Sequence, residues 1–151
     1  MSDAPIVDAY VPAEIARRVE SIGVKKARTD HLTVFTLAVL AGAFISLGGI
    51  FYVVVGTDPR TGFGLSRVLG GIAFSLGLIL VVVGGAELFT GNNLLAMAWA
   101  SKRIGFRELL RNWAIVYLGN VAGSLATFVV VWLAQIGTLG DGQVGAHAAT
   151  I

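Results

Sequence analysis

Residues 32–56 form one continuous stretch of sequence without a charged side chain. About 20 apolar residues in a helix are enough to cross the hydrocarbon core of a bilayer. The composition agrees with a membrane environment, because 56% of the residues are hydrophobic and only 13% are charged, whereas about one quarter of the residues in soluble domains are charged. The stretch therefore predicts a first transmembrane helix in an integral membrane protein.

Two further apolar stretches follow the first. A short polar turn at 57–62, which contains proline and glycine, leads into a long run at 68–100. The third run, 113–135, begins at Trp113 and has Trp132 near its end, as expected of aromatic side chains at the two membrane interfaces. The sequence thus predicts an all-α, polytopic membrane fold with three transmembrane spans.

The segment before the first span alternates apolar and charged residues at roughly helical spacing. This pattern predicts an amphipathic helix that ends near Thr29, either solvated or docked on the membrane face of the assembly. Lys and Arg residues gather before the first span and again between the second and third, whereas only Arg60 and Arg67 flank the first loop. By the positive-inside rule, the N-terminus is expected to be cytoplasmic. No cleaved signal peptide is expected, because the N-terminal residues are polar and of mixed charge.

We therefore expect three parts in the chain. A cytoplasmic amphipathic N-terminal helix occupies 1–30, a three-span transmembrane repeat occupies 31–137, and an extracytoplasmic, glycine-rich tail that reads as truncated occupies 138–151. The expected location is the inner or plasma membrane, with several passes through it.

Several classes of function find no support in the sequence. The absence of cysteine excludes disulfides, thiolate metal sites and thiol nucleophiles. No basic face suited to nucleic acid is found, since the net charge is only +2 and the basic residues lie at the ends of apolar segments. No metal-ligand cluster, nucleophile–base pair or phosphate-binding loop is present, so an enzyme, a metal site and a cofactor are not expected.

The second apolar run is about ten residues longer than one straight span requires, and it contains one carboxylate, Glu87. An isolated carboxylate in hydrocarbon costs at least ~2.5 kcal/mol. Polar residues follow it at Thr90, Asn92 and Asn93, and glycines lie on both sides: Gly84, Gly85 and Gly91. These residues weaken helix continuity and offer local hydrogen bonds to a loosened backbone. They predict a helix that is broken at membrane depth, where irregular backbone is tolerated only in buried or cavity-lining positions.

A broken helix of this kind suggests a permeation site for an anion. The second half-helix would begin near Asn92 and Asn93, with free amide hydrogens and a partial positive charge. Glu87 should not face the anion, because a bare carboxylate would repel it. We expect Glu87 to hold the loop through backbone amides or a neighbouring subunit. A plainer alternative places the polar cluster at the inner membrane surface, with 94–100 as an interfacial stub.

The segment 85–91 reads Gly-Ala-Glu-Leu-Phe-Thr-Gly and resembles the first signature of the formate/nitrite transporter family. Further similarity lies in 70–78, which resembles the family's first pore-lining half-helix, and in 12–27, which resembles its amphipathic start. A last group resembles its third span: Arg111, Asn112, Trp113, Gly119, Asn120 and Gly123. The resemblance covers nearly the whole chain and favours the broken helix over the interfacial alternative.

The resemblance implies an aquaporin-like fold of two inverted three-span repeats, of which this chain is one, in a homopentamer with a pore in each subunit. Phe74 and Leu78 correspond to the side chains that narrow the pore, and their spacing places them on one helix face. Thr90 corresponds to the threonine of the mobile loop and is the expected anion or gating contact. The full loop set is Glu87, Leu88, Phe89, Thr90, Gly91 and Asn92.

The implied function is a channel or transporter for formate, nitrite or a similar small anion, with or without coupled protons. The family's central histidine, vestibule lysine and second signature belong to the other repeat, and His31 and His147 are expected to be surface residues. The alternative is therefore a non-conducting membrane subunit or anchor. The residues do not choose among the anions or fix direction and gating.

Small residues recur at helix-contact spacing in the three spans: Gly42 and Ser46, Gly70 and Gly71, Gly119 and Gly123. Such residues let helices approach closely. They fit contacts between subunits and contacts within one chain equally well.

Overall fold

The computed structural model describes residues 10–151, so the first nine residues of the expected N-terminal part lie outside it. Its elements are α1 (Pro12–Arg28), α2 (His31–Gly56), η1 (Pro59–Thr61), α3 (Phe63–Val83), α4 (Phe89–Asn92), α5 (Leu95–Ala100), α6 (Phe106–Leu133), η2 (Ile136–Thr138) and α7 (Gln143–Ala148). The described chain is helical throughout, without strands. The predicted all-α class is confirmed.

Three of these helices, α2, α3 and α6, are long and apolar enough to cross a membrane. At 1.5 Å per residue they measure about 39, 31 and 42 Å. The predicted three spans are confirmed, but two helices begin earlier than the apolar runs. Helix α3 begins directly after the turn at Gly62, and α6 begins at Phe106 within the basic stretch. Helical hydrogen bonding thus extends beyond the charge-free part of each span.

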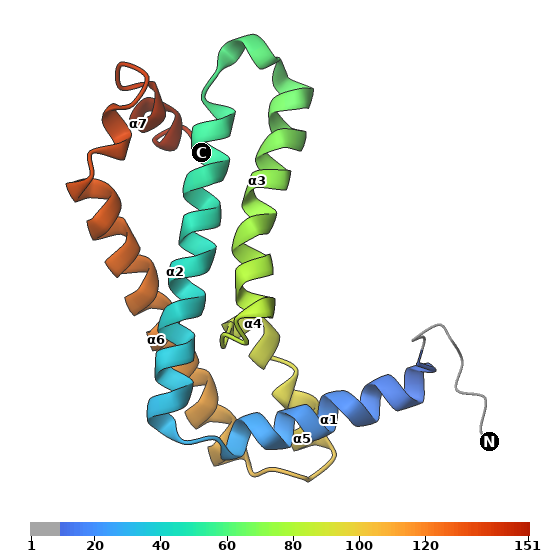
Figure 1. The fold of residues 1–151 in the computed structure, drawn as a ribbon. Helices are drawn as coiled ribbons and strands as arrows, with labels where there is room; N and C mark the ends of the chain where they lie inside the picture. Colours follow the sequence, from blue (N-terminus) through green and yellow to red (C-terminus); the bar gives the residue numbers. More distant parts are fainter. Residues whose placement is uncertain (1–9) are drawn as a thin grey trace.

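Helix α2 stands between α3 and α6 and packs along both (Figure 1). The crossing with α6 is very close, since a Cβ atom at Gly42 would overlap the backbone of Asn120 and one at Gly123 would overlap the Val39 carbonyl. The crossing with α3 brings Gly48 and Gly77 together. For Gly42, Gly119 and Gly123 the structure therefore supports contacts within one chain, whereas Gly71 has open space beside it.

Helix α1 lies across one end of the three spans (Figure 1). Pro12 lies in its first turn, where proline is favoured, and basic residues lie in its last turn, where they interact favourably with the helix dipole. Asp30 caps the next helix by accepting a hydrogen bond from the Thr33 N–H at 2.9 Å. Gly23 and Ala27 are buried against α5. The sequence left two placements open for this helix, solvated or docked. The structure shows that its second half is docked, against α5.

The C-terminal segment returns to the opposite end of the bundle (Figure 1). Helix α6 ends where Gln135 adopts a left-handed conformation with φ 54°, and the short α7 then packs on α2 with Val144 buried. The glycine-rich tail thus contains a short helix. The division into 1–30, 31–137 and 138–151 stays a prediction.

Candidate functional site at the broken helix

The second span is broken directly after α3. Gly85 has φ 62° and ends the helix in a Schellman motif, in which the Ala86 N–H donates to the Val81 carbonyl at 2.9 Å and the Gly85 N–H donates to Val82 at 3.3 Å. Only glycine enters this left-handed region without strain. An extended segment at 86–88 then leads into the single turn of α4. The predicted break is confirmed, and Gly84 and Gly85 are its cause.

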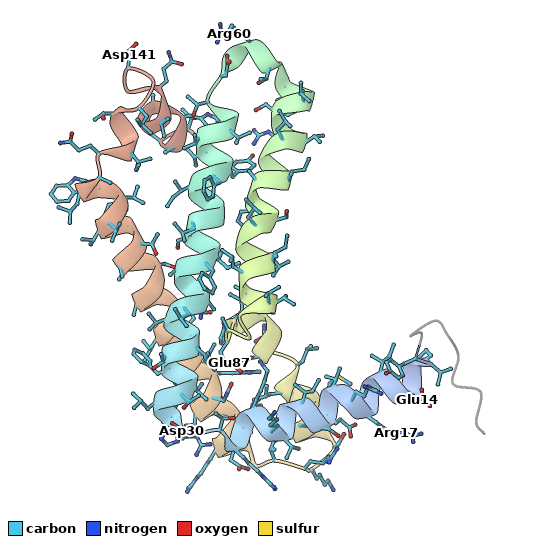
Figure 2. The ribbon with its side chains drawn as sticks, viewed as in Figure 1. Glu14, Arg17, Asp30, Arg60, Glu87 and Asp141 are labelled. Atoms are coloured by element: carbon cyan, nitrogen blue, oxygen red, sulfur yellow. The ribbon has the colours of Figure 1, made fainter. Side chains whose placement is uncertain are left out.

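The break lies inside the bundle rather than at its end. The Glu87 N–H donates to the Leu37 carbonyl at 3.1 Å, and Leu37 is about 9 Å from the start of α2 by helical rise. On the other side the segment contacts Asn120, which is about 21 Å along α6. Figure 2 shows Glu87 above α1, between the spans. The plainer alternative treats residues 94–100 as an interfacial stub, and this segment forms α5. Helix α1 covers α5, with Leu95 and Ala98 buried.

Asn120 holds the irregular backbone to α6 and α2. Its Nδ2 donates to the carbonyls of Ala38 at 2.8 Å and Glu87 at 2.9 Å, and its Oδ1 accepts the Phe89 N–H at 2.9 Å. One side chain therefore supplies hydrogen bonds on both sides of the extended segment, where helical partners are lost. Unpaired backbone groups in an apolar setting would cost several kcal/mol each.

Within the described residues, Glu87 is paired with Lys26 of α1 and not with the expected backbone amides, whereas the expected contact with a neighbouring subunit stays a prediction. Glu87 Oε2 lies 2.8 Å from Lys26 Nζ, which also donates to Asn92 Oδ1 at 2.8 Å. The Glu87 side chain is 11% exposed and that of Lys26 is 28% exposed. A cation at this distance cancels most of the carboxylate's repulsion toward an approaching anion.

Asn92 is completely buried and every polar part of its side chain is used. Its Nδ2 donates to Asn112 Oδ1 at 3.0 Å, and its carbonyl accepts the Trp113 indole N–H at 2.9 Å. The backbone N–H groups of Asn92 and Asn93 bond to Leu88 and Phe89 within the turn. The expectation of free amides at Asn92 and Asn93 is therefore wrong, because α4 starts three residues earlier than expected.

The other loop residues divide into packed and open positions. Leu88 packs on the cluster around Ala41 and Val81, and Phe89 packs edge-on against Trp113 and Tyr117. Thr90 and Gly91 are exposed. Among the described residues, the Thr90 hydroxyl makes no hydrogen bond with another side chain or the backbone. Thr90 therefore remains open to an external partner, as its expected role requires.

Phe74 and Leu78 stand on α3 with 41% and 49% of their surfaces exposed. Phe74 lines a largely apolar cavity of about 730 Å³, together with residues of α2, α6 and α7. Leu78 lies one turn further along α3 on the same face. Phe74 and Leu78 lie on α3 and Thr90 lies on α4, so the structure places the two predicted groups on separate elements. In the part of the chain that is described, no group of His, Asp and Glu is arranged to hold a metal ion.

Sequence reasoning missed the residues that hold the loop: Lys26, Asn112, Trp113 and Asn120. Asn120 could have been found as a polar side chain in the third span, and Lys26 as the nearest lysine in a docked amphipathic helix. Trp113 was interpreted as an interfacial aromatic. Its partly buried ring instead donates a hydrogen bond to the loop.

Comparison with known proteins gives consistent matches. The family model described as formate/nitrite transporter matches residues 13–151. The formate channel FocA of Escherichia coli K12 is 44% identical over 139 residues, which cover 91% of this chain and 49% of that protein. The formate channel BtFdhC of Bacillus thuringiensis is 38% identical over 136 residues, covering 89% and 52%.

A solved structure described as a pentameric formate channel with formate bound superposes with a TM-score of 0.73 and 42% identity. The match covers 78% of this chain and 47% of the other. The chain thus spans about half the length of the relatives it matches.

Proposed function

Because the chain belongs to the formate/nitrite transporter family, we propose that it forms one half of a transmembrane pore for small monovalent anions such as formate or nitrite. The relatives named above are channels and not enzymes. The proposal assigns to this chain the conduction of formate for which those proteins are named. It takes the chain as the first of two inverted repeats.

The observation that carries the proposal is a broken span whose loop backbone is held by side chains of other helices, while the Thr90 hydroxyl is exposed. Asn120 and Asn92 hold the loop, and Lys26 neutralises Glu87. Thr90 is exposed on this fixed turn. In this role its hydroxyl donates a hydrogen bond to an anion that has left bulk water. The ion pair removes the repulsion that a free carboxylate would exert.

Phe74 and Leu78 are proposed to narrow the same pore. Their exposed apolar side chains lie one turn apart on α3. A second repeat, placed opposite this face, would close it into a constriction that passes only small, partly dehydrated anions. The proposed assembly is a homopentamer in the inner or plasma membrane, surrounded by lipid, with a cytoplasmic N-terminus. The solved pentameric relative and the basic residues around α1 support this arrangement.

A second candidate function is a non-conducting membrane subunit or anchor. The observation that bears on it is the apolar surface of α3, where Leu76, Leu78 and Ile79 are each about half exposed and so available for packing. In that case the exposed face of α3 packs against another subunit and no continuous path forms.

The test is anion flux through the full-length protein in liposomes, with formate and nitrite as separate probes. Uptake of either anion above protein-free vesicles supports the pore. Absence of uptake in folded, correctly assembled protein rejects the pore and favours the anchor.

Leu78→Ala sharpens the test, because shortening this side chain should widen the constriction and admit larger carboxylates such as lactate. The matched control is Leu76→Ala, also on α3 and also 49% exposed but on a different face. An unchanged size limit in Leu78→Ala contradicts the proposed constriction.

A further inference from the structure

A small polar pocket lies at the end of the bundle opposite α1, away from the broken helix. It has a volume of about 190 Å³ and is lined by residues of the end of α2, the start of α3 and α7. Its polar lining comes from Tyr52, Asp58, Ser66, Arg67 and His147. Since one water occupies about 30 Å³ in the liquid, this space accommodates an anion of a few heavy atoms together with water.

The pocket carries an uncompensated positive charge. Among the described residues that line it, Asp58 is the only carboxylate, and it is paired with Arg60, whose Nε and Nη2 lie 3.1 Å from Oδ1 and Oδ2. This ion pair points outward, since the Arg60 side chain is 89% exposed. Arg67 instead forms no ion pair within residues 10–151. Its guanidinium donates to the Tyr52 hydroxyl and lies 5.2 Å from the Phe63 ring centroid.

Further donors surround the same space. The His147 Nε2 and the Ser66 hydroxyl both face Gly56, where an added Cβ would lie 2.9 Å from Nε2 and 3.7 Å from Oγ. A guanidinium and a hydroxyl of α3 and an imidazole of α7 thus converge beside Gly56 of α2. Arginine in particular presents a fixed fork of N–H donors that matches a carboxylate or a nitrite.

The pocket is also connected to the proposed conduction path. Arg67 and Phe74 are seven residues apart and so lie on one face of α3, with Gly71 between them. Tyr52 lines both this polar pocket and the apolar cavity that contains Gly71 and Phe74. The Tyr52 ring and hydroxyl therefore stand between a charged compartment and an apolar one.

We propose that the Arg67–His147 pocket is a separate binding station for small carboxylate or nitrite-type anions at the mouth of the chain opposite α1. Arg67 supplies the charge, His147 supplies a hydrogen bond, Ser66 lies beside the bound anion, and Tyr52 separates this station from the narrow apolar path. Transfer of a captured anion past Tyr52 toward Phe74 rests on the proposed function. Binding in the pocket does not.

Binding is tested by protection of a thiol placed in the pocket. The sequence has no cysteine, so Ser66→Cys gives one reactive site in this half once any cysteine elsewhere in the full-length chain is replaced. Its reaction with the uncharged reagent N-ethylmaleimide is timed with and without formate in gluconate buffer. We expect formate to slow the reaction about threefold or more, with saturation. The same protection is expected when Asp58→Asn and Arg60→Gln are added together, which neutralises this ion pair as a whole, and none is expected when Arg67→Gln is added.

Protection that persists in the Arg67→Gln background, or no protection in the Ser66→Cys protein itself, overturns the station. Restoration of protection by Arg67→Lys supports it, because that variant keeps the charge. The result does not depend on transport, so it can hold even if the protein conducts nothing.

The flux experiment tests the link to conduction. Formate is added on the side of the membrane that carries Arg67, and its uptake into liposomes is measured. Under these conditions Arg67→Gln should raise the half-saturating formate concentration about three- to tenfold and leave the maximal rate unchanged. The combined Asp58→Asn and Arg60→Gln variant, which neutralises the ion pair at the same end of the bundle as a whole, should leave both unchanged. Equal half-saturation in Arg67→Gln and wild type contradicts a feeding role. Absence of flux in wild type rejects the proposed function while the protection result stands.

Discussion

The second span, α3, has an interruption of helical geometry on each side, at 57–62 before it and at 84–88 after it, and the two interruptions are stabilised in different ways. The first uses local hydrogen bonds, with Asp58 accepting from the Arg60 N–H at 2.9 Å and the Thr61 hydroxyl donating to the Asp58 carbonyl at 2.7 Å. The second uses partners far away in sequence, including Lys26 and Asn120. Figure 2 shows Arg60 at the outer tip of the first and Glu87 enclosed by the second.

The difference follows from access to water. An exposed turn can leave backbone groups to solvent, so a few neighbouring side chains are sufficient. Backbone inside a membrane bundle must be paired by protein, because each unsatisfied group is costly there. A break at depth therefore requires dedicated residues on other helices, and substitutions should be far more damaging at the second interruption than at the first.

The largest effect is expected for Asn120→Leu. This change removes the partner of three backbone groups at once, of Ala38, Glu87 and Phe89. Each buried group left unpaired costs about 1–3 kcal/mol, so we expect a total loss of about 3 kcal/mol or more. Denaturation of full-length protein in mixed micelles measures it. Ser124→Ala, one turn further along α6 and with a single 3.4 Å bond, is the control, and equal stability of the two variants would contradict the comparison.

A smaller loss is expected for Lys26→Met, which keeps the aliphatic stem and leaves Glu87 without its cation. Removing one partner of a fully buried pair costs about 3–5 kcal/mol. Because the Lys26 side chain is 28% exposed, water compensates partly and we expect about 1–3 kcal/mol. Lys25→Met, at the exposed neighbouring position, should cost little. A double-mutant cycle with Glu87→Gln measures the coupling, and a coupling near zero would show that the pair does not hold the loop.

Thr90→Val should separate conduction from stability within the same loop. Thr90 is exposed, and the nearly isosteric valine should change the free energy of unfolding by less than about 0.5 kcal/mol. Loss of one hydrogen bond to the anion, worth about 1 kcal/mol, should lower formate flux about fivefold. Thr90→Ser keeps the hydroxyl and should restore flux. Equal formate flux through Thr90→Val and the wild type would show that the Thr90 hydroxyl has no role in permeation.

The smallest effect is expected for Asp58→Asn at the exposed turn. The hydrogen bond from the Arg60 side chain, the backbone hydrogen bond and the nearby charge all lower the Asp58 pKa below its usual 3.8. The resulting stabilisation is present above pH 4 and is lost as the pH falls through the lowered value in the folded protein. Wild type and Asp58→Asn should therefore differ slightly in melting temperature at pH 7 and converge in acid. A difference that grows in acid would contradict this assignment.

The fold could be predicted largely from apolar length and glycine placement. Residues 32–56 predict a span, and the Gly84–Gly85 pair together with Glu87 favours a break in the second one. These signals are local, because they depend on what each segment can do by itself in a bilayer.

The partners of the loop could not be predicted in the same way. Lys26 lies in a segment whose pattern indicates only a surface helix, and its distance from Glu87 depends on how α1 docks through Gly23 and Ala27. Asn120 was visible as a polar residue in an apolar span, but the atoms it bonds are set by the crossing of α2 and α6 at Gly42. Tertiary geometry, not composition, makes these contacts.

The bond between Lys26 and Glu87 also sets an order of assembly. The two residues are separated by 61 positions, so Lys26 is synthesised well before its partner exists. Until the second span has inserted, the ammonium must remain hydrated, and a charge at this position opposes entry of α1 into the bilayer. Helix α1 can take its final place only when the broken segment arrives. The last turn of α1 can therefore reach the contact seen in the structure only after residue 87 has been synthesised.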